Sequence, residues 1–182
     1  IVAALDLEVG SDAVLRRAMQ LAKAHGARLV VAHVIEAQSL SHAASLPEGS
    51  ESDLKEHLNR QAQAAISSLL ADGEPLSVDV VIGFGAPHAV VTATAGERGV
   101  DLVVIGPGKC RSLGEKVLGS TADRIVRASP APVLVVRNPS AAPYRRIAAA
   151  VDFSPQCAAV AKDACRLAPT ARLELVHAFS IP

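Results

Sequence analysis

The sequence predicts an α/β fold built on an open, doubly wound, five-stranded parallel sheet with strand order 3-2-1-4-5. Short apolar, β-branched runs alternate with segments whose apolar residues recur at helical spacing, which is typical of β-α-β units. An apolar fraction of 50% over 182 residues is ample for a buried core. Crossovers in such units are right-handed in about 98% of cases. In the order 3-2-1-4-5, strands 1 and 4 are neighbours.

In chain order, each expected strand is a short β-branched run. Strands are expected at residues 1–5, 28–35, 78–82, 101–105 and 133–136. The run at 28–35 is nearly continuous, as in a strand buried on both faces. Residues 36–49 lack periodicity and predict a mobile surface loop, and Gly83-Phe84-Gly85 predicts a turn after the third strand.

The helices between the strands are indicated by their ends and by one apolar face each. We expect them to begin at Ser11, at Ser50 or Ser52, at Pro87 and at Ser120. Ser11 is the expected N-cap of the first helix, which stops at Gly26. Ser120 and Asp123 have the spacing of a capping box, so the fourth helix should start there and run to about Arg127.

The stretch from Ile105 to Thr121 joins the fourth strand to the fourth helix and is rich in glycine. Glycine lets the backbone approach an anion, and a helix start offers unpaired N–H groups and a positive dipole end. Lys109, Arg111 and Lys116 add cationic charge. The spacing is neither that of a Walker loop nor G-x-G-x-x-G. We predict a phosphate cradle, with a ligand-free strand-to-helix connection as the alternative.

Two remote features of the sequence converge in this topology. Asp6 ends the first strand, and the glycine-rich loop ends the fourth. These strands are neighbours whose crossovers leave on opposite faces, so a crevice opens at their carboxyl ends, where ligands of open α/β sheets bind. Asp6 is therefore a candidate ligand-binding residue, or else a carboxylate that caps the next helix or pairs with a cation.

The composition disfavours several classes of partner. The 18 basic and 18 acidic residues balance, and aromatic residues make up 2%, so no nucleic-acid or membrane-surface footprint is expected. The residues given show no basic-then-apolar leader pattern and no run of roughly 20 apolar residues, so we expect a cytoplasmic protein. Three cysteines without a C-x-x-C predict free thiols, and no metal-ligand or catalytic set is predicted.

The pattern of the first strands recurs near the end of the chain. Residues 147–152 echo residues 1–6, and residues 171–177 echo residues 27–33. We therefore predict a complete domain at 1–137, a linker at 138–144, and the first strand-helix-strand of a second, incomplete copy at 145–182. Such a short fragment is unlikely to bury a core alone. It should dock on the first domain, dock on another chain, or belong to a longer protein.

These motifs together resemble the universal stress protein family in its tandem arrangement. The family's nucleotide-binding members have a strand-Asp start and a G-x-x-G-x9-G-[ST] loop, followed by a helix and a Pro-x-Pro-Val strand. Gly106, Gly119 and Ser120 keep that register, and residues 131–136 supply the final strand. The resemblance covers residues 1 to about 137 and the start of a second copy. It implies the fold shared with the adenine nucleotide alpha hydrolase-like proteins.

The resemblance also assigns roles to residues of the site. It places Asp6 and the backbone near Val34 beside adenine, Gly106 beside the ribose, and Gly119, Ser120 and Thr121 beside the phosphates. The family's second glycine falls on Lys109, with Gly108 one place earlier. Residues 106–109 predict a type II turn, which either aims Lys109 at phosphate or closes the site.

The function implied is a stress-response module that binds ATP, with Mg²⁺, or another adenine nucleotide, and acts through occupancy-dependent association. Any hydrolysis is expected to be slow and incidental. The apolar fifth strand is predicted at a sheet edge, a natural surface for a homodimer, through Val133, Leu134, Val135 and Val136. The alternative is a dimerising structural module that binds no nucleotide. An enzyme or electron carrier of the same architecture is a third hypothesis.

Overall fold

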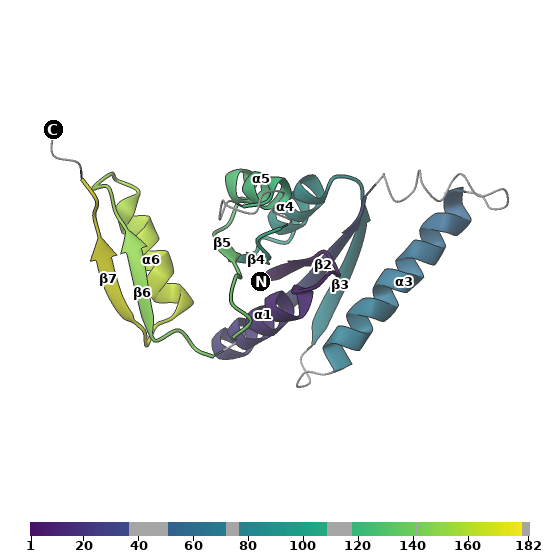
Figure 1. The fold of residues 1–182 in the computed structure, drawn as a ribbon, viewed down its shortest axis with the longest axis horizontal. Coiled ribbons are helices and arrows are strands. Elements are labelled where there is room, and N and C mark those ends of the chain that lie inside the picture. Colours follow the sequence, from purple (N-terminus) through teal and green to yellow (C-terminus); the bar gives the residue numbers. More distant parts are fainter. Residues whose placement is uncertain (37–50, 72–76, 109–117, 141, 180–182) are drawn as a thin grey trace. The chain divides into compact units, whose positions relative to one another are not determined.

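A computed structural model describes residues 1–182 except 37–50, 72–76, 109–117, 141 and 180–182. The chain divides into two compact units, Ile1–Ala141 and Ala142–Pro182 (Figure 1). The loop predicted at 36–49 lies almost entirely outside the described residues, as does the Ser50 cap. In the described part of the chain, no helix is both long and apolar enough to cross a membrane.

The first unit is built on the predicted parallel sheet. Its strands are β1 (Val2–Leu5), β2 (Leu29–Ile35), β3 (Val78–Phe84), β4 (Val103–Ile105) and β5 (Val133–Val135). They lie in the order β3-β2-β1-β4-β5, and every neighbouring pair is parallel. The predicted fold and strand order are confirmed. β1 and β4 lie side by side, and β5 forms one edge of the sheet.

The described helices pack on both faces of this sheet (Figure 1). They are α1 (Ser11–His25), α3 (Glu51–Ala71), α4 (Pro87–Glu97) and α5 (Ser120–Ala128). On one face, Leu15 of α1 and Ile66 of α3 pack in a cluster with Val31 of β2. On the other face, Val91 and Ile125 of α4 and α5 pack with residues of β4. A parallel sheet covered on both faces requires such continuously apolar strands.

The third strand extends further than the sequence predicts. Gly83 and Phe84 were expected in a turn, but they pair with Val34 and Ile35 of β2, and the chain turns at Gly85, where φ is +122°. A Cβ on Gly83 would lie 2.5 Å from the side chain of Val90 in α4. Gly83 is thus a strand residue that lets a helix approach, and the turn prediction was wrong at these two positions.

Two predicted helix caps are displaced by one residue. Gly10, with a φ of +104°, is the N-cap of α1, and Ser11 is the first helical residue. Gly119 is the N-cap of α5, so Ser120 lies past the position from which a hydroxyl caps a first turn. Asp123 pairs with Arg127 at 2.9 Å. The predicted capping box is therefore wrong, although the helix itself is where the sequence placed it.

The second unit contains a strand, a helix and a strand. These are β6 (Arg146–Ala150), α6 (Cys157–Leu167) and β7 (Arg172–Val176). β6 and β7 pair in parallel, with Ala149 opposite Leu175. Leu175 is 62% exposed, whereas Val31, the matching residue of the first unit, is fully buried. The described part of the second unit therefore leaves uncovered a position that the first unit covers with a helix.

Candidate functional site

The turn after β1 is organised around the carboxylate of Asp6. Its Oδ1 accepts a hydrogen bond from the Glu8 backbone N–H at 3.1 Å and another from the Ser11 hydroxyl at 2.7 Å. Between them, Leu7 adopts the left-handed conformation with a φ of +59°. Left-handed backbone is costly for a branched residue, so the surrounding bonds must hold it. Asp6 thus fixes the shape of the β1–α1 turn.

The neighbouring strand β2 brings two further residues to the same edge. His33 is the β2 residue paired with Leu5 at the end of the β1 ladder, and its Nδ1 lies 2.8 Å from the Leu5 carbonyl oxygen. Val34 follows it in β2 and packs against the cluster on the α4 and α5 face. Asp6 and Val34, predicted to border one ligand, therefore both lie at the carboxyl ends of adjacent strands.

The glycine-rich loop leaves the sheet at Gly106, next to the end of β1. β1 and β4 pair through Ala4 and Ile105, so Gly106 follows directly on the strand beside Leu5. A Cβ built on Gly106 would lie 3.5 Å from Val14 of α1. The start of the loop is thereby close to the first turns of α1, the helix whose first residue bonds Asp6.

The two ends of the loop meet each other. The Gly119 N–H donates a hydrogen bond of 2.8 Å to the Pro107 carbonyl. Gly108 has a φ of +73°, the sign that a type II turn requires at its third position. A Cβ there would lie 3.3 Å from the Gly119 Cα, tighter than most real contacts. The backbone at Gly108 and Gly119 is therefore packed closely, and glycine is needed at Gly108.

Helix α5 begins at this closed loop. Ser120 is exposed and Thr121 is half-buried, both in the first turn of α5. The first amides of a helix have no partner within the helix and favour an anion. Lys109, Arg111 and Lys116 lie outside the described residues. The structure thus gathers Gly106, Gly108, Gly119, Ser120 and Thr121 at the carboxyl end of β4.

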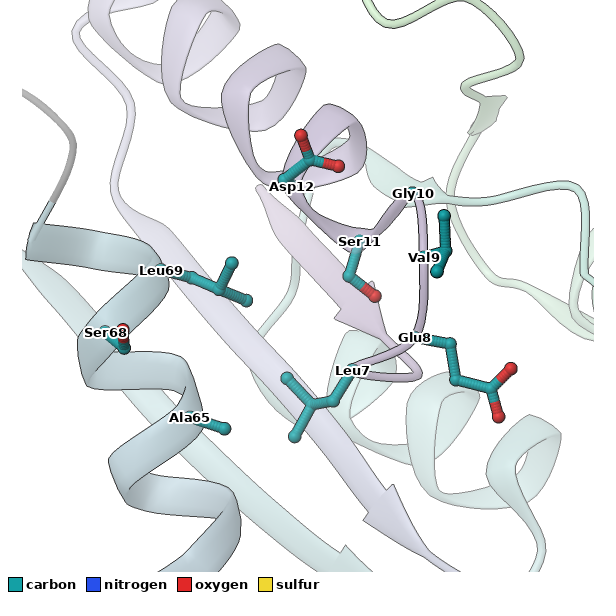
Figure 2. A pocket seen from close by; sticks show the side chains of 9 residues that line it. All are labelled: Leu7, Glu8, Val9, Gly10, Ser11, Asp12, Ala65, Ser68 and Leu69. Atoms are coloured by element: carbon teal, nitrogen blue, oxygen red, sulfur yellow. The ribbon is translucent and has the colours of Figure 1, made fainter.

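A pocket of about 460 Å³ opens beside the Asp6 turn (Figure 2). It is lined by Leu7, Glu8, Val9, Gly10, Ser11 and Asp12 and by Ala65, Ser68 and Leu69 of α3. Figure 2 shows Leu7 and Leu69 facing each other across it, while the Glu8 carboxylate points away from α3. The pocket lies on the α3 side of the turn, and the described phosphate residues Gly119, Ser120 and Thr121 do not line it.

The second unit repeats the Asp6 turn bond for bond. The Asp152 Oδ1 accepts hydrogen bonds from the Ser154 N–H and the Cys157 thiol, both at 3.0 Å. Phe153 has a φ of +60°, and the His177 Nδ1 lies 2.7 Å from the Val151 carbonyl. The sequence repeat identified the aspartate and histidine pairs, but it did not reveal their partners. The signal available for these partners was that Ser11 and Cys157 each lie five residues after the aspartate.

The Asp152 carboxyl is held in its ionised form by these donors. The Ser154 hydroxyl, the Cys157 thiol and the Ser154 N–H together hold the pKa of Asp152 well below its ordinary value. Because the folded pKa is lower than the unfolded one, the resulting stability is fully present above about pH 3.9 and is lost as the pH falls toward the folded pKa.

We therefore expect the carboxyl ¹³C resonance of Asp152 to titrate well below pH 3.9, the approximate midpoint of an unperturbed aspartate. Ser154→Ala should move the midpoint upward, since it removes the strongest donor. Thr170→Ala, which removes an exposed hydroxyl from the same unit, should leave it unchanged. An unperturbed midpoint in the native chain would contradict the assigned bonds.

The described residues hold no cluster of three or more His, Cys, Asp or Glu side chains able to bind a metal ion. Cys157 and Cys165 are free thiols. Cys110 lies outside the described residues.

Comparison with known protein families matches residues 1–137 to the universal stress protein family. The chain belongs to this family. A universal stress protein of Thermus aquaticus is 34% identical over 117 residues, which cover 64% of this chain and 82% of that protein. The residues matched to the family, 1–137, include both the Asp6 turn and the glycine-rich loop.

Two solved structures have a similar fold: one is a universal stress protein, and the other is a longer chain. A universal stress protein in complex with cAMP has a TM-score of 0.56 at 24% identity, covering 75% of this chain and 94% of that one. PA1789 of Pseudomonas aeruginosa, described as functionally unknown, has a TM-score of 0.63 at 19% identity. That match covers 97% of this chain but 58% of the other, so it includes the second unit's fold.

Proposed function

We propose that this universal stress protein binds ATP or another adenine nucleotide at the carboxyl ends of β1 and β4. The observation that carries the proposal is the closed glycine loop, joined by the Gly119–Pro107 hydrogen bond, beside the Asp6 turn. Two adjacent strands whose crossovers leave on opposite faces form the usual ligand crevice of such sheets. A solved relative in fold is a complex with cAMP, which supports an adenine nucleotide.

Each part of the site suits one part of the nucleotide. Asp6 and the backbone at Val34 would border the adenine, and Gly106 the ribose. Gly108, Lys109, Gly119, Ser120 and Thr121 would surround the phosphates, with Mg²⁺ neutralising their charge. The closely packed glycines fit this role, since the absence of side chains at Gly108 and Gly119 would let an anion approach the first backbone N–H groups of α5.

Nucleotide binding would act by ordering the loop and changing association. β5 lies at a sheet edge, and Val133, Leu134 and Val135 in it are only partly buried. Together with the buried Val136 that follows, this edge is the proposed homodimer surface. We place the protein in the cytoplasm and expect at most slow, incidental ATP hydrolysis.

We also propose that residues 145–182 begin a second copy of the domain, after a linker at 138–144. The repeated Asp152 turn and the repeated His177 contact support this tandem arrangement. The exposed Leu175 supports it too, because its counterpart is covered in the complete unit. In a complete copy, a helix following β7, as α3 follows β2, would bury it.

A thermal-shift titration with ATP and Mg²⁺ tests the binding proposal. A ligand at 100 times its Kd adds about 2.7 kcal/mol of stability. GTP and inorganic triphosphate, titrated in parallel, separate recognition of adenine from recognition of phosphate. No shift with millimolar ATP and Mg²⁺ would overturn the proposal.

That result would favour the second candidate, a dimerising module that binds no nucleotide. The hydrogen bonds of Asp6 favour this candidate, because they give its carboxylate a complete structural role in the β1–α1 turn.

A further inference from the structure

Two histidines occupy the same place in the two units. His33 lies opposite Leu5 at the last pair of the β1–β2 ladder, and its Nδ1 is 2.8 Å from the Leu5 carbonyl oxygen. His177 follows β7, and its Nδ1 is 2.7 Å from the Val151 carbonyl oxygen. In both units, the carbonyl belongs to the residue immediately before the turn aspartate.

The partner of each histidine fixes its protonation pattern. A backbone carbonyl can only accept a hydrogen bond, so Nδ1 must carry the proton. The neutral imidazole is then the Nδ1–H tautomer, with its lone pair on Nε2. A second proton on Nε2 leaves the Nδ1–H donor in place. The contact with the carbonyl therefore exists in both charge states of the ring.

Holding this carbonyl also holds the aspartate that follows it. The Leu5 C=O and the Asp6 N–H belong to one planar peptide unit, so a bond that orients the oxygen orients the start of Asp6. The next residue, Leu7, is in the left-handed region, and Asp6 must reach both the Glu8 amide and the Ser11 hydroxyl. A rotated peptide at Leu5 would break this arrangement.

Both units keep the histidine–carbonyl contact and the hydrogen-bonded aspartate, while the residues around them differ. Leu7 corresponds to Phe153, Glu8 to Ser154 and Ser11 to Cys157. Even so, each aspartate accepts bonds from a backbone N–H two residues on and a side chain five residues on. Within this hydrogen-bonded turn, the histidine and the aspartate are the side chains that stay the same in both copies.

We propose that His33 is a positioning residue for Asp6, acting through its Nδ1–H bond to the Leu5 carbonyl. This positioning role extends the proposed function, and its expected effect on ATP affinity rests on that function. His33 need not touch the nucleotide. It sets the peptide plane from which the Asp6 side chain leaves β1.

A pair of amide substitutions tests the geometry of the donor. In His33→Asn the amide nitrogen is bonded to Cγ, as Nδ1 is, so a donor stays near the carbonyl. In His33→Gln the amide nitrogen lies one bond further out, near the place of Nε2. We expect Gln to weaken ATP binding about tenfold and Asn to change it by no more than about threefold, as for one misplaced hydrogen bond.

The exposed His57 on α3 provides the control, and His57→Ala should bind ATP as the native chain does. Equal affinities for the Asn and Gln variants would overturn the proposal. An equal loss of ATP affinity in both variants would mean that the imidazole ring itself contacts the ligand, which would also overturn the proposal.

Two measurements on the ligand-free chain decide the positioning role without nucleotide. The ¹⁵N resonances of the imidazole should show the Nδ1–H tautomer for His33 and His177, and an Nε2–H tautomer would overturn the proposal. Amide exchange at Glu8, which bonds Asp6, should rise about tenfold in His33→Gln but not in His33→Asn. If the native chain fails to bind ATP while both results hold, the proposed function fails and the positioning role stands.

Discussion

Ile66→Ala is expected to lower the free energy of unfolding of the first unit by about 2–5 kcal/mol, the usual cost of emptying a core position. Ile66 has no exposed surface, and it is the largest of the fully buried side chains of α3. The only other buried residue in this helix of 21 residues is Ala62. Ile66 is therefore the fully buried anchor of α3, with Leu69 and Leu70 packed partly buried beside it, and urea denaturation should report its loss.

The loss should be greatest in α3 itself. Amide exchange in Glu51–Ala71 should rise more than exchange in α4, because α4 packs on the opposite face of the sheet. Ile66→Val removes one methylene group and should cost about 0.5–1.5 kcal/mol. If the two variants unfolded at the same urea concentration, Ile66 would not be the anchor of α3.

The sheet could be predicted because its signals are local and repeated. Nearly continuous apolar runs such as Leu29–Ile35 have few alternatives to a strand buried on both faces. Alternation with helical segments, together with right-handed crossovers, then leaves few possible strand orders. The adjacency of Asp6 and Gly106 followed from that order alone, without any knowledge of their side-chain contacts.

Helix ends were harder to predict because more than one residue could cap each helix. Ser11 has a favourable capping side chain, but its hydroxyl bonds Asp6, and Gly10 takes the left-handed cap position instead. Likewise, Gly119 and not Ser120 is the N-cap of α5. Side-chain preferences identify such ends only to within a residue or two.

Contacts between distant parts of the chain left no local signal. Arg17 lies on a helix face that the sequence assigned to apolar residues, and it is 4% exposed. Its guanidinium donates hydrogen bonds to the Gln20 side chain and to the Ser140 carbonyl, 123 residues away. The pocket beside Leu7 similarly needs Leu69 of α3. Neither contact can be inferred from spacing along one element.

Gly119→Val is expected to abolish the stabilisation of the chain by ATP, about 2.7 kcal/mol at 100 times the native Kd. The φ of −59° and ψ of 154° at Gly119 suit any residue, so valine should not strain the backbone. Its side chain would instead crowd a buried position beside Gly108, where the loop ends meet. Thermal shift and titration calorimetry with ATP and Mg²⁺ would measure the loss.

Gly96→Ala provides the matched control for removing a glycine. Gly96 lies within α4, and a Cβ there would meet only Pro130, at 4.0 Å. Alanine should therefore stabilise the helix by about 0.5–1 kcal/mol and leave ATP binding unchanged. Native affinity in Gly119→Val would contradict the site, because a β-branched side chain at the start of α5 cannot share that space with a phosphate. A loss of affinity in both variants would instead indicate a general effect of the substitutions on the fold.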